Sequence, residues 1–263
     1  MTSRTTSGTT TEGAASLWLR RYGNATDPTV RLVCLPHAGG SATYFFPLAK
    51  ALPAHIEVLA VQYPGRQDRY SEPFIDNVVT LAEHLLGVLR TQRDLPLVLF
   101  GHSMGATVAF EIARRLVVEQ PDGPLAGMIV SARCAPSKHR SNGIHLLDDA
   151  GILAEVNKLS GTQAAVLEDE ELIQMVLPVL RNDYRAAETY SYTPGAPLPV
   201  PIVGISGESD SRVSSSDIDE WQAHTSAGYA SYALPGGHFY FGTEPAALAA
   251  ALAGDALLRP ADT

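Results

Sequence analysis

The sequence has little cysteine: only Cys34 and Cys134 occur among its 263 residues, and each lies in or beside an apolar run. A cysteine in such a run commonly behaves as a small buried hydrophobic side chain, so no disulfide framework is predicted. The sequence also lacks HExxH and paired CxxC motifs, and its histidines are dispersed. No metal site is therefore predicted.

Long apolar runs and basic clusters are missing as well. The longest apolar runs, such as residues 95–100, are far too short to span a bilayer as a helix, so no membrane partner is predicted. Residues 1–15 are rich in Thr, Ser and Gly and lack the apolar stretch of a secretory signal, which predicts a flexible tail and a cytoplasmic protein. The net charge is -9 and no run is rich in Lys or Arg, so nucleic acid is not expected as a partner.

What the sequence does contain is a repeating pattern of buried strands and amphipathic helices. Helical periodicity is clearest in residues 78–90 and 104–119. Short β-branched runs that end at Gly, Pro or polar clusters are typical of strands buried on both faces of a parallel sheet. These runs are residues 30–35, 57–61, 95–100, 127–131 and 200–206. The alternation predicts an α/β fold, a mostly parallel sheet flanked by helices, in a single domain over residues 16–263.

The alternation breaks between residues 137 and 192. Two helical stretches, 148–160 and 169–181, follow one another there without a strand between them. Long insertions in compact domains are often functional, so this segment is predicted to be a helical lid. The alternative is an elongated crossover that has no gating role.

The segment LPLVLFGHSMGATVAFEIARRL places a Gly-His-Ser-Met-Gly motif between a predicted strand and a predicted helix. A GxSxG motif alone occurs in ordinary turns, but this context is that of a nucleophile elbow. The glycines at 101 and 105 remove side chains that would collide with neighbouring chain, and the turn puts the hydroxyl at the positive end of the following helix. The motif predicts Ser103 as the nucleophile of a serine hydrolase with the α/β-hydrolase fold.

A serine hydroxyl needs a base and an orienting acid, which in this fold follow the serine in the order acid, then histidine. Asp210 lies just beyond the strand at 200–206, at the sheet edge where ligands bind, and is the predicted acid. His238 follows the segment YALPGG, which would end a last strand, and is the predicted base. A solvated loop residue and a structural histidine are the respective alternatives. The other histidines after Ser103 fit less well, since two precede the expected acid and one lies in a polar stretch typical of a surface helix: His139, His145 and His224.

Hydrolysis of this kind also needs backbone donors for the oxyanion, and no cofactor. One donor in this fold is the N–H after the nucleophile, here that of Met104. The other comes from a loop after an early strand, and Ala38 in the PHAGG segment at 36–40 is the candidate. A phosphate-binding loop is the competing interpretation, but the Lys and Ser/Thr residues of a P-loop are missing.

These segments together resemble the stand-alone type II thioesterases of polyketide and non-ribosomal peptide biosynthesis, and the related thioesterase of animal fatty-acid synthesis. The resemblance covers nearly the whole chain after the tail. It is carried by CLPHAGGSA at 34–42, VQYPGRQDR at 61–69, FGHSMGA at 100–106, LPVLRNDYRAAETY at 177–190, GESDSRV at 207–213 and LPGGHFYF at 234–241. The family's triad maps onto Ser103, Asp210 and His238, and its oxyanion donors onto Ala38 and Met104.

The resemblance implies hydrolysis of acyl thioesters on the phosphopantetheine arm of carrier proteins, in editing or release. Carrier proteins are generally acidic, so docking on this acidic chain would use an apolar or locally basic patch near the lid. Four arginines near the quoted segments are better interpreted as solvated or structural than as docking residues: Arg66, Arg69, Arg181 and Arg185. A general carboxylesterase or lipase is the first alternative, because the triad does not itself select thioesters. A non-catalytic binding module is the second, and its usual mark, a broken triad, is missing.

Overall fold

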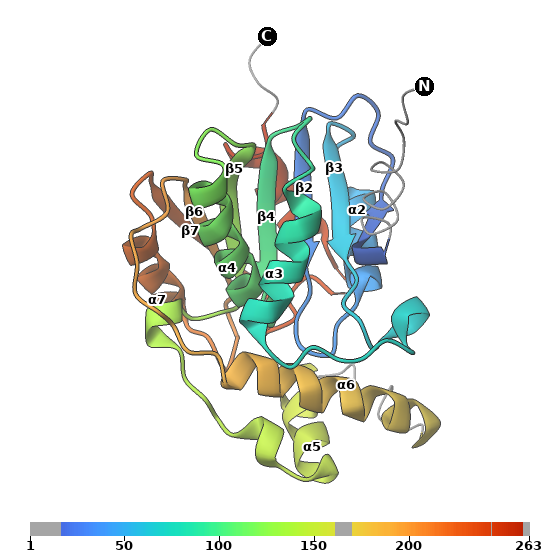
Figure 1. Ribbon diagram of the computed structural model, residues 1–263. Helices are drawn as coiled ribbons and strands as arrows, with labels where there is room; N and C mark the ends of the chain where they lie inside the picture. Colours follow the sequence, from blue (N-terminus) through green and yellow to red (C-terminus); the bar gives the residue numbers. More distant parts are fainter. Residues whose placement is uncertain (1–16, 161–169, 243, 260–263) are drawn as a thin grey trace, which may run out of the picture.

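The computed structural model describes residues 17–160, 170–242 and 244–259, and the predicted tail at residues 1–15 lies outside them (Figure 1). Its centre is a seven-stranded sheet with the strand order β1-β3-β2-β4-β5-β6-β7. Every neighbouring pair is parallel except β1 and β3. The strands are β1 Leu19–Tyr22, β2 Val30–Leu35, β3 Ile56–Val61, β4 Leu97–His102, β5 Leu125–Ser131, β6 Ile202–Gly207 and β7 Tyr229–Leu234. The predicted α/β fold class is confirmed.

Helices cover both faces of this sheet. The α-helices are α2 Phe46–Ala51, α3 Val78–Leu89, α4 Met104–Glu119, α5 Asp149–Ser160, α6 Glu170–Glu188, α7 Ser215–Asp219 and α8 Ala246–Gly254. In β2, Val33 and Leu35 pack in one cluster with α3 and α4, whereas Leu32 and Cys34 pack in a second cluster with α2 and α8. Successive side chains of a strand point to opposite faces, so a strand covered on both sides is apolar throughout. This explains the continuous apolar runs in the sequence.

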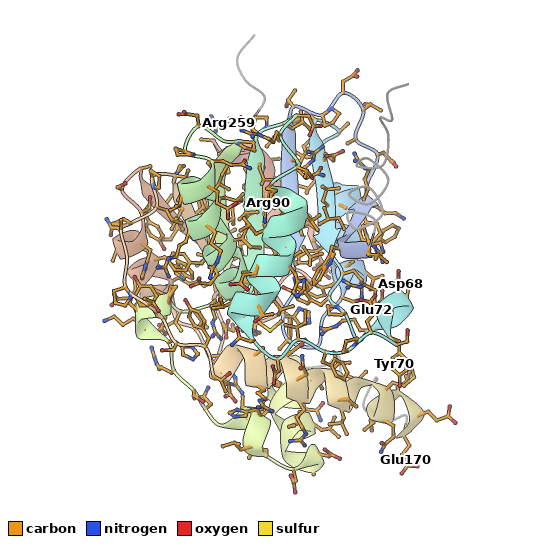
Figure 2. The ribbon with its side chains drawn as sticks, viewed as in Figure 1. Asp68, Tyr70, Glu72, Arg90, Glu170 and Arg259 are labelled. Carbon is orange, nitrogen blue, oxygen red and sulfur yellow. The ribbon has the colours of Figure 1, made fainter. Side chains whose placement is uncertain are left out.

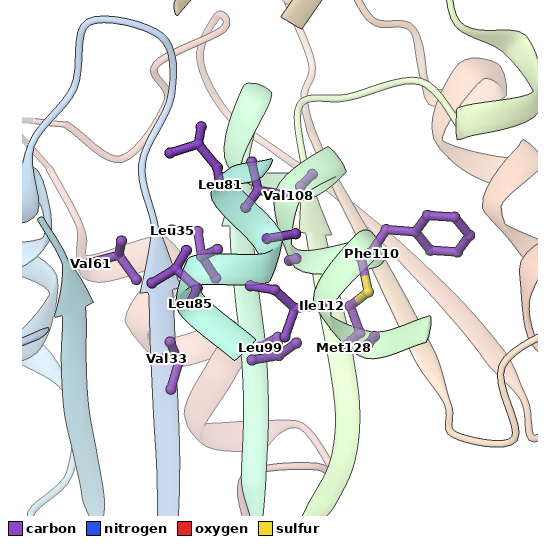
Figure 3. Close-up of a cluster of buried hydrophobic side chains, with 14 of the residues drawn as sticks. Val33, Leu35, Val61, Leu81, Leu85, Leu99, Val108, Phe110, Ile112 and Met128 are labelled. Carbon is purple, nitrogen blue, oxygen red and sulfur yellow. The ribbon is translucent and has the colours of Figure 1, made fainter. Parts of the chain in front are cut away.

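Charged side chains lie on the outside of the molecule except for a few buried ones, which include the ion-paired Arg66 and Asp183. The side chains of Asp68 and Arg259 lie at the periphery in Figure 2, and both residues are exposed. The interior between the sheet and helices α3 and α4 is filled by apolar side chains, as Figure 3 shows for Leu35 of β2, Leu85 of α3 and Phe110 of α4. Both cysteines are free, in agreement with the prediction that no disulfide framework exists. Among the described residues, none of the helices combines the length and the hydropathy that a membrane span requires.

Several elements differ from the sequence-based expectation, and β1 and α6 show why. β1 was not expected, because two of its four residues are arginines; it is an edge strand paired antiparallel with β3, so only part of it is buried. Helix α6 continues to Glu188 instead of ending at 181. Its last turns are held by tertiary contacts, since Asp183, Ala186 and Ala187 are buried, and such contacts override local preference.

The insertion between residues 137 and 192 lies beside the edge of the sheet that the carboxyl ends of the parallel strands form. In Figure 1, α5 and α6 lie together below the strands. They share a small apolar cluster of their own with a preceding 3-10 turn, separate from the two main clusters. Its buried members are Ile144, Ile152, Leu177 and Leu180. The insertion is therefore a small layer added to the edge, with residues 161–169 outside the described part.

Gly105 provides a test of how closely α4 approaches β2. A Cβ atom at Gly105 would lie 2.1 Å from the carbonyl oxygen of Leu35, so backbone would have to move. We expect Gly105→Ala to lower the free energy of unfolding by about 1–3 kcal/mol, the usual cost of overpacking. The measurement is urea unfolding followed by circular dichroism. Gly87→Ala is the control: a Cβ at this position in α3 meets nothing within 4 Å, so about 0.5–1 kcal/mol of stabilisation is expected. The same change in the free energy of unfolding in both variants would contradict the prediction.

Candidate active site

Ser103 stands at a sharp turn between β4 and α4. Its backbone has φ 53° and ψ -117°, a conformation that a residue with a side chain rarely adopts. Its N–H donates to the carbonyl of Ser131, 2.8 Å away, which ties the turn to β5. A Cβ at Gly101 would lie 2.4 Å from the Cα of Ala106, so the predicted steric need for small residues on both sides of Ser103 is confirmed. The turn presents the hydroxyl at the N-terminus of α4.

Asp210 and His238 lie next to Ser103, at the edge of the sheet formed by the carboxyl ends of the strands. The Nε2 atom of His238 is 3.1 Å from the Ser103 Oγ atom, and its Nδ1 atom is 2.8 Å from the Asp210 Oδ2 atom. The Asp210 side chain is fully buried and that of His238 is 5% exposed. With Nδ1–H donating to the carboxylate, Nε2 is left to accept the hydroxyl proton. The three residues predicted from their order in the chain thus form one hydrogen-bonded line.

The second oxygen of Asp210 fixes the carboxylate in place. Oδ1 accepts the backbone N–H groups of Arg212 at 2.8 Å and Val213 at 3.3 Å. Two such bonds prevent rotation of the carboxylate. The loop after β6, which continues with Ser211, therefore holds the Asp210 carboxylate in one orientation.

The backbone N–H groups predicted as oxyanion donors face the same space. Ala38 and Met104 line one cavity together with Ser103 and His238. Neither N–H has an acceptor within the part of the chain that the structure describes. Met104 is the first residue of α4, where N–H groups have no partner inside the helix. Two free donors beside a hydroxyl are what a developing oxyanion needs.

The cavity has a volume of about 620 Å³ and lies between the sheet edge and the insertion. Its floor is formed by residues at the strand ends, including Ser103 and Ala132. The insertion supplies the opposite wall through Arg140, Asn142, Ile144, Leu147, Glu155, Lys158, Leu159, Tyr184, Ala187 and Glu188. A volume of this size is in the range of small-molecule sites.

Two further histidines lie behind the site in an aromatic cluster. The ring of His102 is 5.4 Å from that of His238 and 5.7 Å from that of His37. Burial lowers the pKa of His37 to about 3 and holds the pKa of His102 well below its usual range, and the nearby His238 acts in the same direction on both. Nδ1 of His102 lies 2.8 Å from the Ser131 hydroxyl oxygen. Both rings are therefore neutral at physiological pH.

The lowered pKa values of His37 and His102 predict a pH dependence of stability. A histidine in the unfolded chain binds a proton near pH 6.5, whereas His37 and His102 do so only at lower pH when folded. The unfolded state then holds more protons below pH 6.5, so the free energy of unfolding falls as pH is lowered. We expect a decrease of about 1 kcal/mol for each histidine between about pH 7.5 and 5.5, measured by urea unfolding. In His37→Phe the free energy of unfolding should decrease less over this pH range than in the parent, since one of the two histidines is gone. The same decrease in the variant and the parent would contradict the prediction.

The remaining histidines and arginines singled out in the sequence have structural partners. His145 pairs with Glu188. His224 is buried and hydrogen-bonds Ser137, so the expectation of a surface helix through Gly228 was wrong: the 3-10 turn ends at His224. The four arginines are all in ion pairs: Arg66 with Asp183, Arg69 with Glu72, Arg181 with Asp149 and Arg185 with Asp76. No group of His, Cys, Asp and Glu able to hold a metal ion occurs in the described residues.

Asp183 is the residue near the site whose contacts the sequence did not reveal. It lies in α6, and its Oδ2 atom accepts the N–H of Gly39, next to Ala38, at 2.8 Å. It lies beyond residue 181, where the predicted helix ended, so the sequence pattern gave it no particular position. The quoted segment at 177–190 contained it, but nothing in the residue pattern assigned it a partner 144 residues away.

The sheet order, the elbow and the hydrogen-bonded Ser103, His238 and Asp210 define the class as the α/β-hydrolase fold. Comparison with protein families gives a match of residues 30–254 to the thioesterase domain family. The chain belongs to the thioesterase family. The chain is 47% identical over 228 residues to the thioesterase PikA5 of Streptomyces venezuelae, covering 86% of this chain and 80% of that protein. It is 44% identical to a probable cadicidin biosynthesis thioesterase of Streptomyces griseus, covering 88% of this chain but 64% of that protein.

Solved structures agree with this assignment. The type II thioesterase BorB from the borrelidin biosynthetic cluster superposes with a TM-score of 0.84 at 45% identity, covering 92% of this chain and 98% of that one. YbtT, a type II thioesterase from the yersiniabactin pathway, superposes with a TM-score of 0.75 at 31% identity, covering 85% and 92%. The predicted resemblance to type II thioesterases and the predicted hydrolase activity on thioesters are confirmed.

Proposed function

We propose that this thioesterase hydrolyses acyl groups from the phosphopantetheine arm of carrier proteins, with Ser103, His238 and Asp210 as its catalytic triad. The single observation that carries the proposal is the His238 ring. One of its nitrogens lies within hydrogen-bond distance of the Ser103 hydroxyl and the other of the buried Asp210 carboxylate. This is the geometry that general-base activation of a serine requires.

In the first half of the reaction, His238 Nε2 accepts the Ser103 proton as Oγ attacks the thioester carbonyl carbon. The N–H groups of Ala38 and Met104 donate to the oxyanion, and the dipole of α4 favours the same negative charge. Asp210 stabilises the imidazolium and keeps Nδ1 protonated. The tetrahedral intermediate then collapses, the carbon–sulfur bond breaks, and the thiolate leaves with the proton from His238.

In the second half, water replaces the thiol. His238 takes a proton from this water, whose oxygen attacks the carbonyl carbon of the acyl-Ser103 ester. The second oxyanion is bound by the same two N–H groups, and its collapse returns the proton to Ser103 Oγ. The products are the free acid and the unmodified serine, and no cofactor takes part in either half.

The insertion at residues 137–192 acts in this proposal as a lid over the acyl group. The support is its position: α5 and α6 provide one wall of the cavity that contains Ser103. The described part of the insertion has a small apolar cluster of its own, while Ala186, Ala187 and Tyr190 near its end pack in the main core. Such a layer can adapt to acyl groups of different shape at little cost to the rest of the fold.

The proposed partner is a carrier protein of a polyketide or non-ribosomal peptide synthase. The support is that the similar thioesterases BorB and YbtT belong to the borrelidin and yersiniabactin biosynthetic pathways. The chain is acidic overall, so an acidic partner needs a local apolar or basic surface. The lid offers large exposed apolar side chains for this purpose: Leu146 at 78% and Met175 at 52% exposure.

A substrate panel tests this function against a general esterase. We expect a higher kcat/KM for a butyryl carrier protein than for butyryl-CoA, because only the carrier protein can dock on the lid. The value for butyryl-CoA should exceed that for an aryl butyrate, because the aryl ester lacks the phosphopantetheine arm. All three are compared at equal concentration. Preference for the aryl ester would favour a carboxylesterase instead. Failure of a fluorophosphonate probe to label Ser103 would favour a binding module.

A further inference from the structure

A buried ion pair connects helix α6 to the loop that carries Ala38. The Asp183 side chain is 1% exposed. Its Oδ2 atom accepts a hydrogen bond from Nη1 of Arg66 at 2.5 Å, and its Oδ1 atom accepts one from Nη2 at 2.9 Å. Oδ2 also accepts the backbone N–H of Gly39 at 2.8 Å. The carboxylate is thus shared between an arginine after β3 and the backbone of the loop after β2.

Arg66 holds the other side of the same loop. Its side chain is 7% exposed, and Nη1 donates to the carbonyl of Gly40 at 3.0 Å. The N–H of Gly40 in turn donates to the carbonyl of His37 at 2.9 Å. Backbone groups of both glycines are therefore fixed by one ion pair.

This chain of bonds determines where the Ala38 N–H points. The peptide between His37 and Ala38 is planar and trans, so its C=O and N–H point in opposite directions. Because Gly40 holds the His37 carbonyl on one side, the Ala38 N–H is directed to the other, into the cavity that contains Ser103. Gly39 has φ +80°, and a Cβ there would lie 2.5 Å from a methyl group of Leu180 on α6, so the helix also touches the loop directly.

Stability alone is a poor explanation for this pair. Removing two charges from water costs several kcal/mol each, and apolar side chains of similar volume often serve as well or better. The pair is nevertheless satisfied on all sides, since Asp183 also accepts a bond from Asn182. Fixed geometry at a nearby functional group is what such a network can provide.

We propose that Asp183 and Arg66 are positioning residues that hold the Ala38 N–H toward the oxyanion of the reaction. The inference rests on the proposed function, because it requires acyl transfer at Ser103. It makes the part of α6 around Asp183 a component of the oxyanion site as well as a wall of the cavity. Substrate entry must then leave this part of α6 in place, since its withdrawal would release Gly39.

The test uses the full chain and the butyryl thioester of N-acetylcysteamine. Asp183→Asn keeps the size of the side chain but removes its charge. Arg66→Met combined with Asp183→Leu removes both charges together, which avoids an unpaired buried ion and preserves the fold. For each we expect kcat to fall about 10- to 100-fold, less than the roughly 10²–10³-fold loss of deleting an oxyanion donor, with KM within about threefold of the parent.

A second readout separates positioning from a general structural role. A trifluoromethyl ketone analogue of the thioester adds to Ser103 and places an oxyanion between the same donors. Its inhibition constant should rise by the factor by which kcat/KM falls, while the apparent pKa of the pH–rate profile stays at the parent's value. The matched control is Asp76→Asn, which breaks the exposed ion pair between α6 and the same β3–α3 connection. It should change both readouts less than twofold.

Each outcome either supports or overturns the positioning role of Asp183 and Arg66. A folded double variant, or Asp183→Asn, with kcat and inhibition constant within twofold of the parent overturns the inference. So does a loss of kcat without a change in inhibition constant, or an equal loss in Asp76→Asn. If the unmodified chain fails to hydrolyse the thioester, the proposed function itself is wrong, which is a different result from an active parent with active variants.

Discussion

Ser103→Ala is expected to lower kcat for an acyl thioester by roughly 10⁴- to 10⁶-fold, the range found when triad members of serine hydrolases are removed. The physical reason is the loss of the hydroxyl oxygen that lies 3.1 Å from His238 Nε2. Covalent acyl transfer then cannot occur, and only slow attack by water within the oxyanion site remains. KM should change little, because the cavity walls are intact. Single-turnover and steady-state hydrolysis assays measure the effect.

The control for this variant is Ser141→Ala, at an exposed serine in the insertion. It should keep kcat within about twofold, since surface substitutions rarely perturb a fold. A fluorophosphonate probe should label the parent and Ser141→Ala at one site and leave Ser103→Ala unlabelled. Near-normal hydrolysis by Ser103→Ala would end the proposed mechanism.

Asp210→Asn is expected to lower kcat by about 10⁴-fold, the effect of the corresponding change in a well-studied triad. The amide keeps the size of the carboxylate, and its oxygen can still accept the N–H groups of Arg212 and Val213. Its NH₂ group, however, would face Nδ1 of His238, which must then become an acceptor. The ring is forced into the tautomer with a proton on Nε2, where it cannot take the proton of Ser103. The variant should remain folded with a nearly unchanged KM.

Asp217→Asn is the matched control, because Asp217 lies on the next helix of the same segment. Its carboxylate closes a capping box with Ser214 and pairs with Arg140. We expect a loss of stability of about 1 kcal/mol and a kcat within twofold of the parent. If Asp210→Asn retained more than a tenth of the parent's kcat, or both variants lost activity equally, the acid would have to be assigned elsewhere.

Much of this architecture could be predicted because the signals are local. The strand ending at His102 and the helix starting at Met104 each have their own periodicity, and the glycines around Ser103 answer a steric demand within a few residues. Asp210 and His238 could be located because each follows a strand, and the carboxyl ends of parallel strands share one edge. β1 escaped prediction because an edge strand buries too little to leave an apolar pattern.

The sequence by itself determined the alternation of the central strands and helices, the elbow and the three residues that lie together there, since periodicity, turn sterics and chain order are properties of short segments. The tertiary structure alone decided how far α6 extends and what holds the loop at Ala38. Asp183 is 117 residues from Arg66 and 144 from Gly39, and no local pattern marks a carboxylate for partners so distant. Only packing of the insertion against the sheet edge brings these groups out of water together, and there an unpaired charge would be costly enough to require them to meet.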